Sequence, residues 1–112
     1  MSDCLFCKIA AGEIPSETVY EDENYFAFND VSPQAPTHFL IIPKQHISKV
    51  SEMSASDTEL IGGLFSVAKK ICDDRSISDY RLVMNNGAGA GQTVFHIHLH
   101  VLAGRAMNWP PG

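Results

Sequence analysis

Three histidines near the C-terminal end of this 112-residue chain alternate with aliphatic residues. His96, His98 and His100 are each separated by one apolar residue, and a period of two is typical of a half-buried β-strand. We therefore predict a strand over residues 95–102 whose imidazoles share one face. The apolar side chains expected to point into the core are Phe95, Ile97, Leu99 and Val101. Neighbouring histidines would lie about 6.6 Å apart and the outer two about 13 Å, so one metal ion would reach two of them but hardly all three.

Three imidazoles on one face need a chemical reason, because an unpaired buried imidazole is costly. Two interpretations remain open at this point. In the first, the His-x-His pair of His96 and His98 presents two ligands to a catalytic zinc. In the second, one histidine is a nucleophile and its neighbours orient it.

A glycine-rich segment, residues 85–93, leads directly into the predicted histidine strand. Taken alone it is typical of a hairpin connection, and it is not a Walker loop because no Gly-Lys-Ser/Thr follows. Next to three histidines, such a loop could turn backbone N–H groups toward an anion. Gln92 and Thr93 would then lie at the mouth of the site with donors for a phosphate oxygen. This arrangement favours a phosphoryl substrate over carbon dioxide or a peptide.

Cys4 and Cys7 form a Cys-x-x-Cys pair at the start of a predicted helix. The pair could be redox-active, could be half of a zinc site, or could be small apolar filler. The absence of a βαβ pattern around it disfavours the redox interpretation. Cys72, in the middle of a longer predicted helix, is most simply a buried filler.

Composition predicts one globular domain over residues 1–112, with 45% apolar and 19% charged residues. The net charge of −5 argues against a nucleic-acid partner gripped by a basic face. No apolar run approaches the ~20 residues of a membrane span, and the N-terminal sequence does not resemble a secretory signal. The cysteine count is three, an odd number that disfavours a disulfide framework. We therefore expect a cytoplasmic protein with reduced thiols and no membrane partner.

The expected elements are two helices and five strands in an α+β arrangement with an antiparallel sheet. A short helix over residues 4–11 should end at Gly12, and a capping box of Ser56 and Glu59 should open the long helix at residues 57–73. Gly62 and Gly63 would permit close packing of that helix or a kink. The predicted strands are residues 19–21, 25–28, 37–42, 80–85 and 95–102.

The stretch from His96 to Leu102 resembles the signature of the histidine triad (HIT) family. Residues 30–48 and the final Trp-Pro-Pro-Gly are similar to the histidine triad nucleotide-binding (Hint) branch of that family. The resemblance covers nearly the whole chain and implies a homodimer whose sheet extends across the two subunits.

The resemblance also implies an activity, the hydrolysis of purine nucleoside 5′-phosphoramidates. His98 would attack the α-phosphorus to form a nucleotidyl-histidine that water then hydrolyses. His96, His100 and His38 would complete the catalytic cluster, and a nearby imidazolium could protonate the leaving amine. The nucleotide contacts that the resemblance implies are Asp30 for the ribose, Phe6, Ile9, Phe28 and Val31 for the base, Asn85, Gly91, Gln92 and Thr93 for the phosphate, and Trp109 from a tail that crosses the dimer.

Some relatives bind a structural zinc, and the resemblance implies Cys4, Cys7, His46 and His96 as its ligands here. No organic cofactor is expected. Other functions remain as alternatives: a dinucleoside polyphosphate hydrolase, a hydrolase centred on zinc held by His96 and His98, or a nucleotide-binding regulator with little catalysis. The base preference and the leaving amine are left undecided by the sequence.

Overall fold

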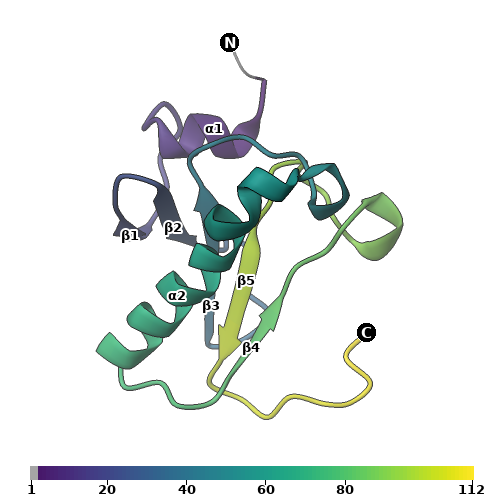
Figure 1. Ribbon diagram of the computed structural model, residues 1–112. Helices are drawn as coiled ribbons and strands as arrows, with labels where there is room; N and C mark the ends of the chain where they lie inside the picture. Colours follow the sequence, from purple (N-terminus) through teal and green to yellow (C-terminus); the bar gives the residue numbers. More distant parts are fainter. Residues whose placement is uncertain (1–2) are drawn as a thin grey trace.

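The computed structural model describes residues 3–112 and contains one five-stranded antiparallel sheet with strand order β1-β2-β3-β5-β4. Two α-helices lie beside the sheet, α2 across its length and α1 near one end (Figure 1). The α+β architecture is therefore confirmed. The elements are α1 (Leu5–Ala10), β1 (Thr18–Glu21), β2 (Tyr25–Asn29), β3 (Thr37–Pro43), α2 (Thr58–Asp74), β4 (Tyr80–Val83) and β5 (Leu99–Ala103), with 3₁₀ turns η1 (Val50–Glu52), η2 (Ala55–Asp57) and η3 (Ala88–Ala90).

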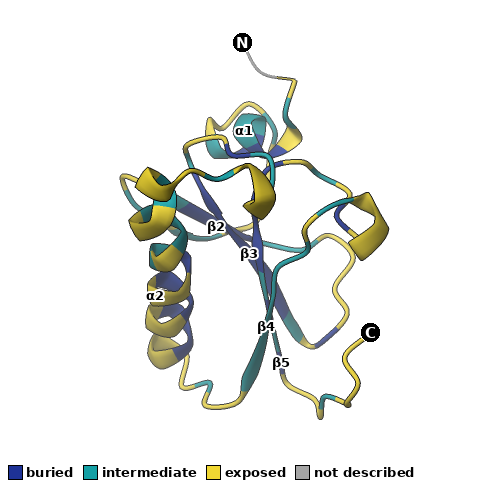
Figure 2. Ribbon diagram, turned by 45° about the vertical axis from the view of Figure 1, so that its right-hand side comes forward, coloured by how far each residue is buried: buried dark blue, intermediate teal, exposed yellow. Residues whose placement is uncertain are grey.

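The central strand β3 is buried on both faces, and its side chains divide the core in two. Phe39 and Ile41 pack with Leu99 and the buried stripe of α2 on one face. Leu40 and Ile42 point to the other face, where they form a smaller cluster with Phe6 of α1 and neighbouring residues. In Figure 2 the inner stripe of α2 and the strands β2 and β3 are buried, while the outer stripe of α2 is exposed. Because side chains alternate along a strand, residues next to Leu99 in β5 must face away from α2.

The histidine strand is shorter than the sequence predicts. β5 begins at Leu99, where it pairs with Ile41 of β3, and residues 92–98 lie outside the sheet, with a bend at 94–96. Phe95, expected in the core, is 43% exposed. The cause is β3, which ends at Pro43, a residue without an N–H to continue the ladder. Beyond that point the Ile97 amide bonds the Ile47 carbonyl at 2.7 Å.

The capping box of the long helix is also different from the prediction. Ser54 and Asp57 form it, three residues apart at the 3₁₀ turn η2, and α2 itself begins at Thr58. Ser56 and Glu59 are not the pair, because the Asp57 carboxylate already accepts from the Ser54 amide at 2.9 Å. Within residues 3–112, no helix is long and apolar enough to cross a lipid bilayer.

Of the two alternatives predicted for Gly62 and Gly63, close packing or a kink, the structure supports close packing at Gly63. A Cβ at Gly63 would overlap the hydroxyl of Tyr25, and that hydroxyl donates to the Leu60 carbonyl at 2.7 Å. A Cβ at Gly62 would meet nothing within 4 Å.

Candidate functional site

The ring of His98 is held in one tautomer by the main chain two residues before it. His98 Nδ1 lies 2.7 Å from the carbonyl oxygen of His96. Because a carbonyl can only accept, Nδ1 carries the proton, and Nε2 keeps its lone pair. The ring is 6% exposed, and the edge of the Phe6 ring packs against it with centroids 5.0 Å apart. The sequence-predicted nucleophile is thus in the tautomer that nucleophilic attack through Nε2 requires.

His38 and His100 form a second hydrogen-bonded pair on the same face. The Gln34 amide donates to His38 Nδ1 at 3.0 Å, so the His38 proton must be on Nε2. That Nε2 lies 2.9 Å from His100 Nδ1 and 3.3 Å from a carboxylate oxygen of Asp30. His100 Nδ1 therefore accepts, and its own proton is on Nε2.

Two ring nitrogens remain available to a ligand, one a lone pair and the other a donor. No buried side-chain nitrogen or oxygen within residues 3–112 lacks a hydrogen-bond partner. Nδ1 makes the bonds of both His98 and His100, so their Nε2 atoms are the ones that reach the surface. The two rings lie side by side with centroids 5.0 Å apart. The site therefore presents a nucleophilic lone pair beside an N–H donor.

Burial keeps these imidazoles neutral at ordinary pH. Desolvation, reinforced by the neighbouring imidazoles of His98 and His38, lowers the pKa of His100 to about 4. Desolvation also lowers the pKa of His98 and His38, while the Asp30 carboxylate acts in the opposite direction on both. A neutral ring is the form that can attack phosphorus.

A pocket of about 680 Å³ opens beside Asp30. Its walls come from α1, the end of β2 and the loops next to them. Four of the predicted nucleotide contacts line this pocket, namely Ile9, Phe28, Asp30 and Val31. Phe6 packs edge-on between Phe28 and His98, at 5.3 and 5.0 Å between ring centroids. These residues are therefore brought together around a mainly apolar space, which is linked to the histidines through Asp30, 3.3 Å from His38 Nε2.

The glycine-rich loop is closed on itself, in contrast to the open phosphate cradle expected. Gln92 is buried, and its side-chain amide bonds the Ser48 and Val94 carbonyls and accepts from the Gly87 amide. The amides of Ala90, Gly91 and Gln92 bond carbonyls within the loop. In this conformation Gln92 therefore shapes the loop and offers no free donor.

The other predicted phosphate and tail residues lie outside the pocket beside Asp30. Asn85 lies beside Gly91, close to where a Cβ on that glycine would point. Thr93 is exposed and lines a different pocket, together with Cys4 and His46. Trp109 is 83% exposed.

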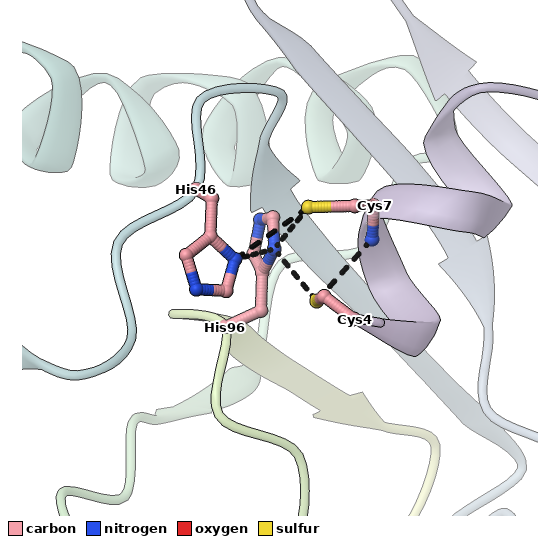
Figure 3. Close-up of side chains that lie close together, drawn as sticks. All are labelled: Cys4, Cys7, His46 and His96. Carbon is pink, nitrogen blue, oxygen red and sulfur yellow. Dashed lines mark hydrogen bonds between the residues drawn. The ribbon is translucent and has the colours of Figure 1, made fainter. Parts of the chain in front are cut away.

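Four side chains from three separate segments converge at the start of α1 (Figure 3). The ligand atoms of Cys4, Cys7, His46 and His96 all lie within 4.8 Å of one another. The two Nδ1 atoms are 3.2 Å apart, and the measured sulfur-to-nitrogen distances are 3.3 to 3.5 Å. A tetrahedral zinc site with bonds of about 2.0–2.3 Å has ligand separations of about 3.3–3.8 Å. The sequence-predicted cluster is present, and it could hold a metal ion.

The tautomer of His96 suits a metal ligand. Its Nε2 lies 2.7 Å from the Pro43 carbonyl, so the proton is on Nε2 and the Nδ1 lone pair points at the other three ligands. The ring is fully buried, and desolvation lowers its pKa to about 4, against the opposing effect of the Pro43 carbonyl. Both nitrogens of His96 are therefore engaged away from His98. The arrangement does not support a catalytic zinc shared by His96 and His98, because their lone pairs do not converge on one point.

Sequence reasoning missed the main-chain groups that set these tautomers. The carbonyls of Pro43 and His96 and the amide of Gln34 decide which nitrogen of each ring is free. No side-chain pattern reveals them, since any residue could supply the same backbone group.

Comparison with known proteins identifies the family. Residues 11–107 match the HIT domain, and the chain belongs to this family. It is 51% identical to an uncharacterized HIT-like protein of Synechocystis sp. over 98% of this chain and 97% of that protein. It is 54% identical to the structure of a HIT family hydrolase from Legionella pneumophila, with a TM-score of 0.95 and coverage of 98% of this chain and 100% of that one. The histidine triad nucleotide-binding protein of Candida albicans is 32% identical, with a TM-score of 0.82 over 96% of this chain and 83% of that one. The family prediction is thus confirmed, and the named relatives support a hydrolase.

Proposed function

We propose that this protein is a nucleoside phosphoramidase of the Hint branch, acting in the cytoplasm on purine nucleoside 5′-phosphoramidates. The observation that carries the proposal is the hydrogen bond from His98 Nδ1 to the His96 carbonyl. It leaves an Nε2 lone pair facing outward beside a pocket with an apolar wall and the Asp30 carboxylate. An aromatic base and a ribose have the matching chemistry, and the C. albicans relative is named as nucleotide-binding.

The reaction would proceed in two displacements at one phosphorus. The His98 Nε2 lone pair forms a bond to the α-phosphorus, and the bond from phosphorus to the amine breaks. The amine leaves with its electron pair and takes up a proton. Water then attacks the same phosphorus, the bond to Nε2 breaks, and the nucleoside monophosphate is released. Throughout, the Nδ1–H bond to the His96 carbonyl stabilises the positive charge that develops on the ring.

His100 would act first as a donor toward the phosphate oxygens. Its Nδ1 already accepts from His38, which leaves Nε2–H for the substrate. Because its pKa is about 4 in the free protein, the imidazolium expected as general acid is not present before binding. An anionic phosphate beside the ring favours the protonated form of His100. His100 would therefore take up a proton from solvent when the substrate binds, and it would pass that proton to the leaving amine.

The Cys4–Cys7–His46–His96 cluster fits a structural zinc, as the donor set and the ligand separations indicate. When bound, the ion would cross-link α1 to the segments that carry the two histidines. Cys4 and Cys7 are reduced thiols, the form that metal binding requires, and a reducing compartment such as the cytoplasm maintains that form.

A homodimer is also proposed. Strand β4 is an edge of the sheet, and edge strands present unpaired backbone groups. The Trp109 side chain is 83% exposed, as expected of a residue that a second copy covers. Light scattering after gel filtration would measure the mass in solution, and a value of one chain would contradict this part of the proposal.

The decisive experiment uses adenosine and guanosine 5′-phosphoramidates as substrates. AMP or GMP release should be rapid, and acid quenching of a single turnover should trap a nucleotidyl adduct that peptide mass spectrometry maps to His98. Release without any adduct on His98 would contradict the covalent mechanism. Absence of release would contradict the proposed substrate class.

A further inference from the structure

His96 joins the two clusters within a single residue. Its side chain presents Nδ1 to Cys4, Cys7 and His46, while its carbonyl holds Nδ1 of His98. Any shift of the His96 backbone therefore changes the bond that fixes the His98 ring. The Pro43 carbonyl holds Nε2 of the same His96 ring at 2.7 Å, which fixes the direction in which the Nδ1 lone pair points.

The helix α1 reaches His98 from the other side. Cys4 and Cys7 stand at the start and in the first turn of α1, and Phe6 lies between them. The Phe6 ring meets the His98 ring at 87° with centroids 5.0 Å apart. A helix of six residues is short, and an isolated helix of that length is not stable by itself. Its position therefore depends on its contacts, which include the two thiols.

We infer that metal occupancy of the Cys4–Cys7–His46–His96 cluster sets the orientation of the His98 ring, so that the metal regulates the rate of the reaction. With four ligands bound, the His96 carbonyl and the Phe6 ring hold His98 from two sides. Without metal, the start of α1 and the His96 residue lose the ligand bonds that join them, and the His98 ring samples other orientations. This inference rests on the proposed function, and it makes His96 a positioning residue.

The cluster is open to exchange with solvent. A pocket of about 470 Å³ is lined by Cys4, His46 and Thr93, among others, and His46 is exposed. An ion can thus enter or leave on the His46 side while the hydrophobic core stays closed. The nucleotide pocket is lined by Ile9 of α1 as well as by the end of β2 and the loops beside it. Metal loss should therefore both lower kcat and raise KM.

The experiment compares the full-length chain with and without Zn²⁺, using ¹⁵N-labelled protein. Long-range ¹H–¹⁵N spectra distinguish a protonated ring nitrogen from one with a lone pair. With zinc bound, His98 should give one sharp tautomer with the proton on Nδ1. With zinc removed, or in His46→Ala, the signals of the two ring nitrogens of His98 should average, and kcat should fall about tenfold.

Cys72→Ala is the matched control, since it removes a buried thiol in α2 outside the cluster. It should lower stability slightly while zinc binding, the His98 spectrum and kcat stay as in the parent. The inference is overturned when zinc leaves and the His98 spectrum is unchanged, because the cluster then serves only the fold. It is equally overturned when micromolar Zn²⁺ does not bind. The spectra test whether zinc fixes the His98 ring even if the protein hydrolyses no phosphoramidate. Failure of this inference can therefore be distinguished from failure of the proposed function.

Discussion

Each of the two histidine clusters of this protein contains one histidine from residues 96–100, His96 in the first and His100 in the second. The ring nitrogens of these two histidines nevertheless have different hydrogen-bond partners. Cys4, Cys7, His46 and His96 bring ligand atoms within 4.8 Å of one another, and so do Asp30, His38 and His100. In the first cluster His96 Nε2 carries the proton and donates it to the Pro43 carbonyl, and the Nδ1 lone pair faces the other ligands. In the second, the His38 proton lies between His38 and His100. The ligand atoms are equally close in both clusters, but only in the first does the central ring turn a lone pair toward several other ligand atoms.

The difference teaches that the main-chain partner of an imidazole decides its chemistry. A metal at His38 Nε2 would need a lone pair there, which would move the proton to Nδ1, where the Gln34 amide already donates. The second cluster is therefore suited to hydrogen bonding and proton transfer, and the first to a metal.

Removing the nucleophile should give the largest effect. In His98→Ala the lone pair that we propose to attack phosphorus is absent, so phosphoramidate turnover should fall by more than about a thousandfold. The zinc cluster uses no atom of the His98 ring, so zinc stoichiometry should stay at the parental value. Steady-state kinetics and metal analysis on the same sample measure both. Near-parental turnover in this variant would remove His98 from the mechanism.

Breaking the metal cluster should also lower the stability of the fold. Zn²⁺ binds only the folded arrangement of four ligands, so free zinc at a hundredfold excess over its dissociation constant should raise the free energy of unfolding by about 3 kcal/mol. Cys7→Ser should abolish this increment. Urea unfolding with and without a chelator measures it, and nucleotide binding to the variant should persist. A zinc-dependent increment that survives in Cys7→Ser would show that zinc binds elsewhere.

Protonation should disturb the His38–His100 pair. The pKa of His100 is lowered from 6.5 to about 4 by burial and by the neighbouring imidazoles. Between these values the unfolded chain binds more protons, so the contribution of His100 to stability is complete above about pH 6.5 and is lost as pH falls toward about 4. Urea unfolding in the presence of a chelator, repeated between about pH 4 and pH 6.5, gives the free energy of unfolding as a function of pH. This free energy should rise less steeply with pH in His100→Gln than in the parent. Equal slopes would contradict a neutral buried His100.

Much of the fold could be predicted from the sequence, because periodicity and turn residues act locally. The short helix ending at Gly12, the strands before Pro43 and the long amphipathic helix all follow from such patterns. The predicted histidine strand is longer than the observed one, because the alternation of apolar and histidine residues continues through residues 95–98. What ends the strand is its partner β3, which stops at Pro43, and a pairing limit set by a distant segment is not visible in the segment itself.

The site could be predicted less completely. The family resemblance brought out the four metal ligands and the His38–His100 pair, and the structure places each set together. Gln92 was expected to face a phosphate, but its amide is occupied by the Ser48 and Val94 carbonyls. A side chain with two donors and an acceptor suits either use, and only the position of those backbone groups distinguishes them.

The smallest effects on the two clusters should come from substitutions in α2, which lies on the opposite face of the sheet. Such substitutions change stability without touching either cluster. In Gly62→Ala a Cβ would meet nothing within 4 Å, so the better helix propensity of alanine should raise the free energy of unfolding by up to about 1 kcal/mol. In Gly63→Ala the Cβ would overlap the Tyr25 hydroxyl and disturb its bond to the Leu60 carbonyl. Overpacking of this kind should cost about 1–3 kcal/mol.

Measured at a temperature where both variants are folded, zinc affinity and kcat should match the parent in each. If the Gly63→Ala variant lost zinc or turnover in proportion to its lost stability, the effects of Cys7→Ser and His46→Ala would reflect a loosened fold rather than their own cluster. Opposite signs for the two glycines, with both clusters unaffected, would instead show that stability and site geometry are separable in this domain. The coupling through the His96 carbonyl would then be a property of that one residue.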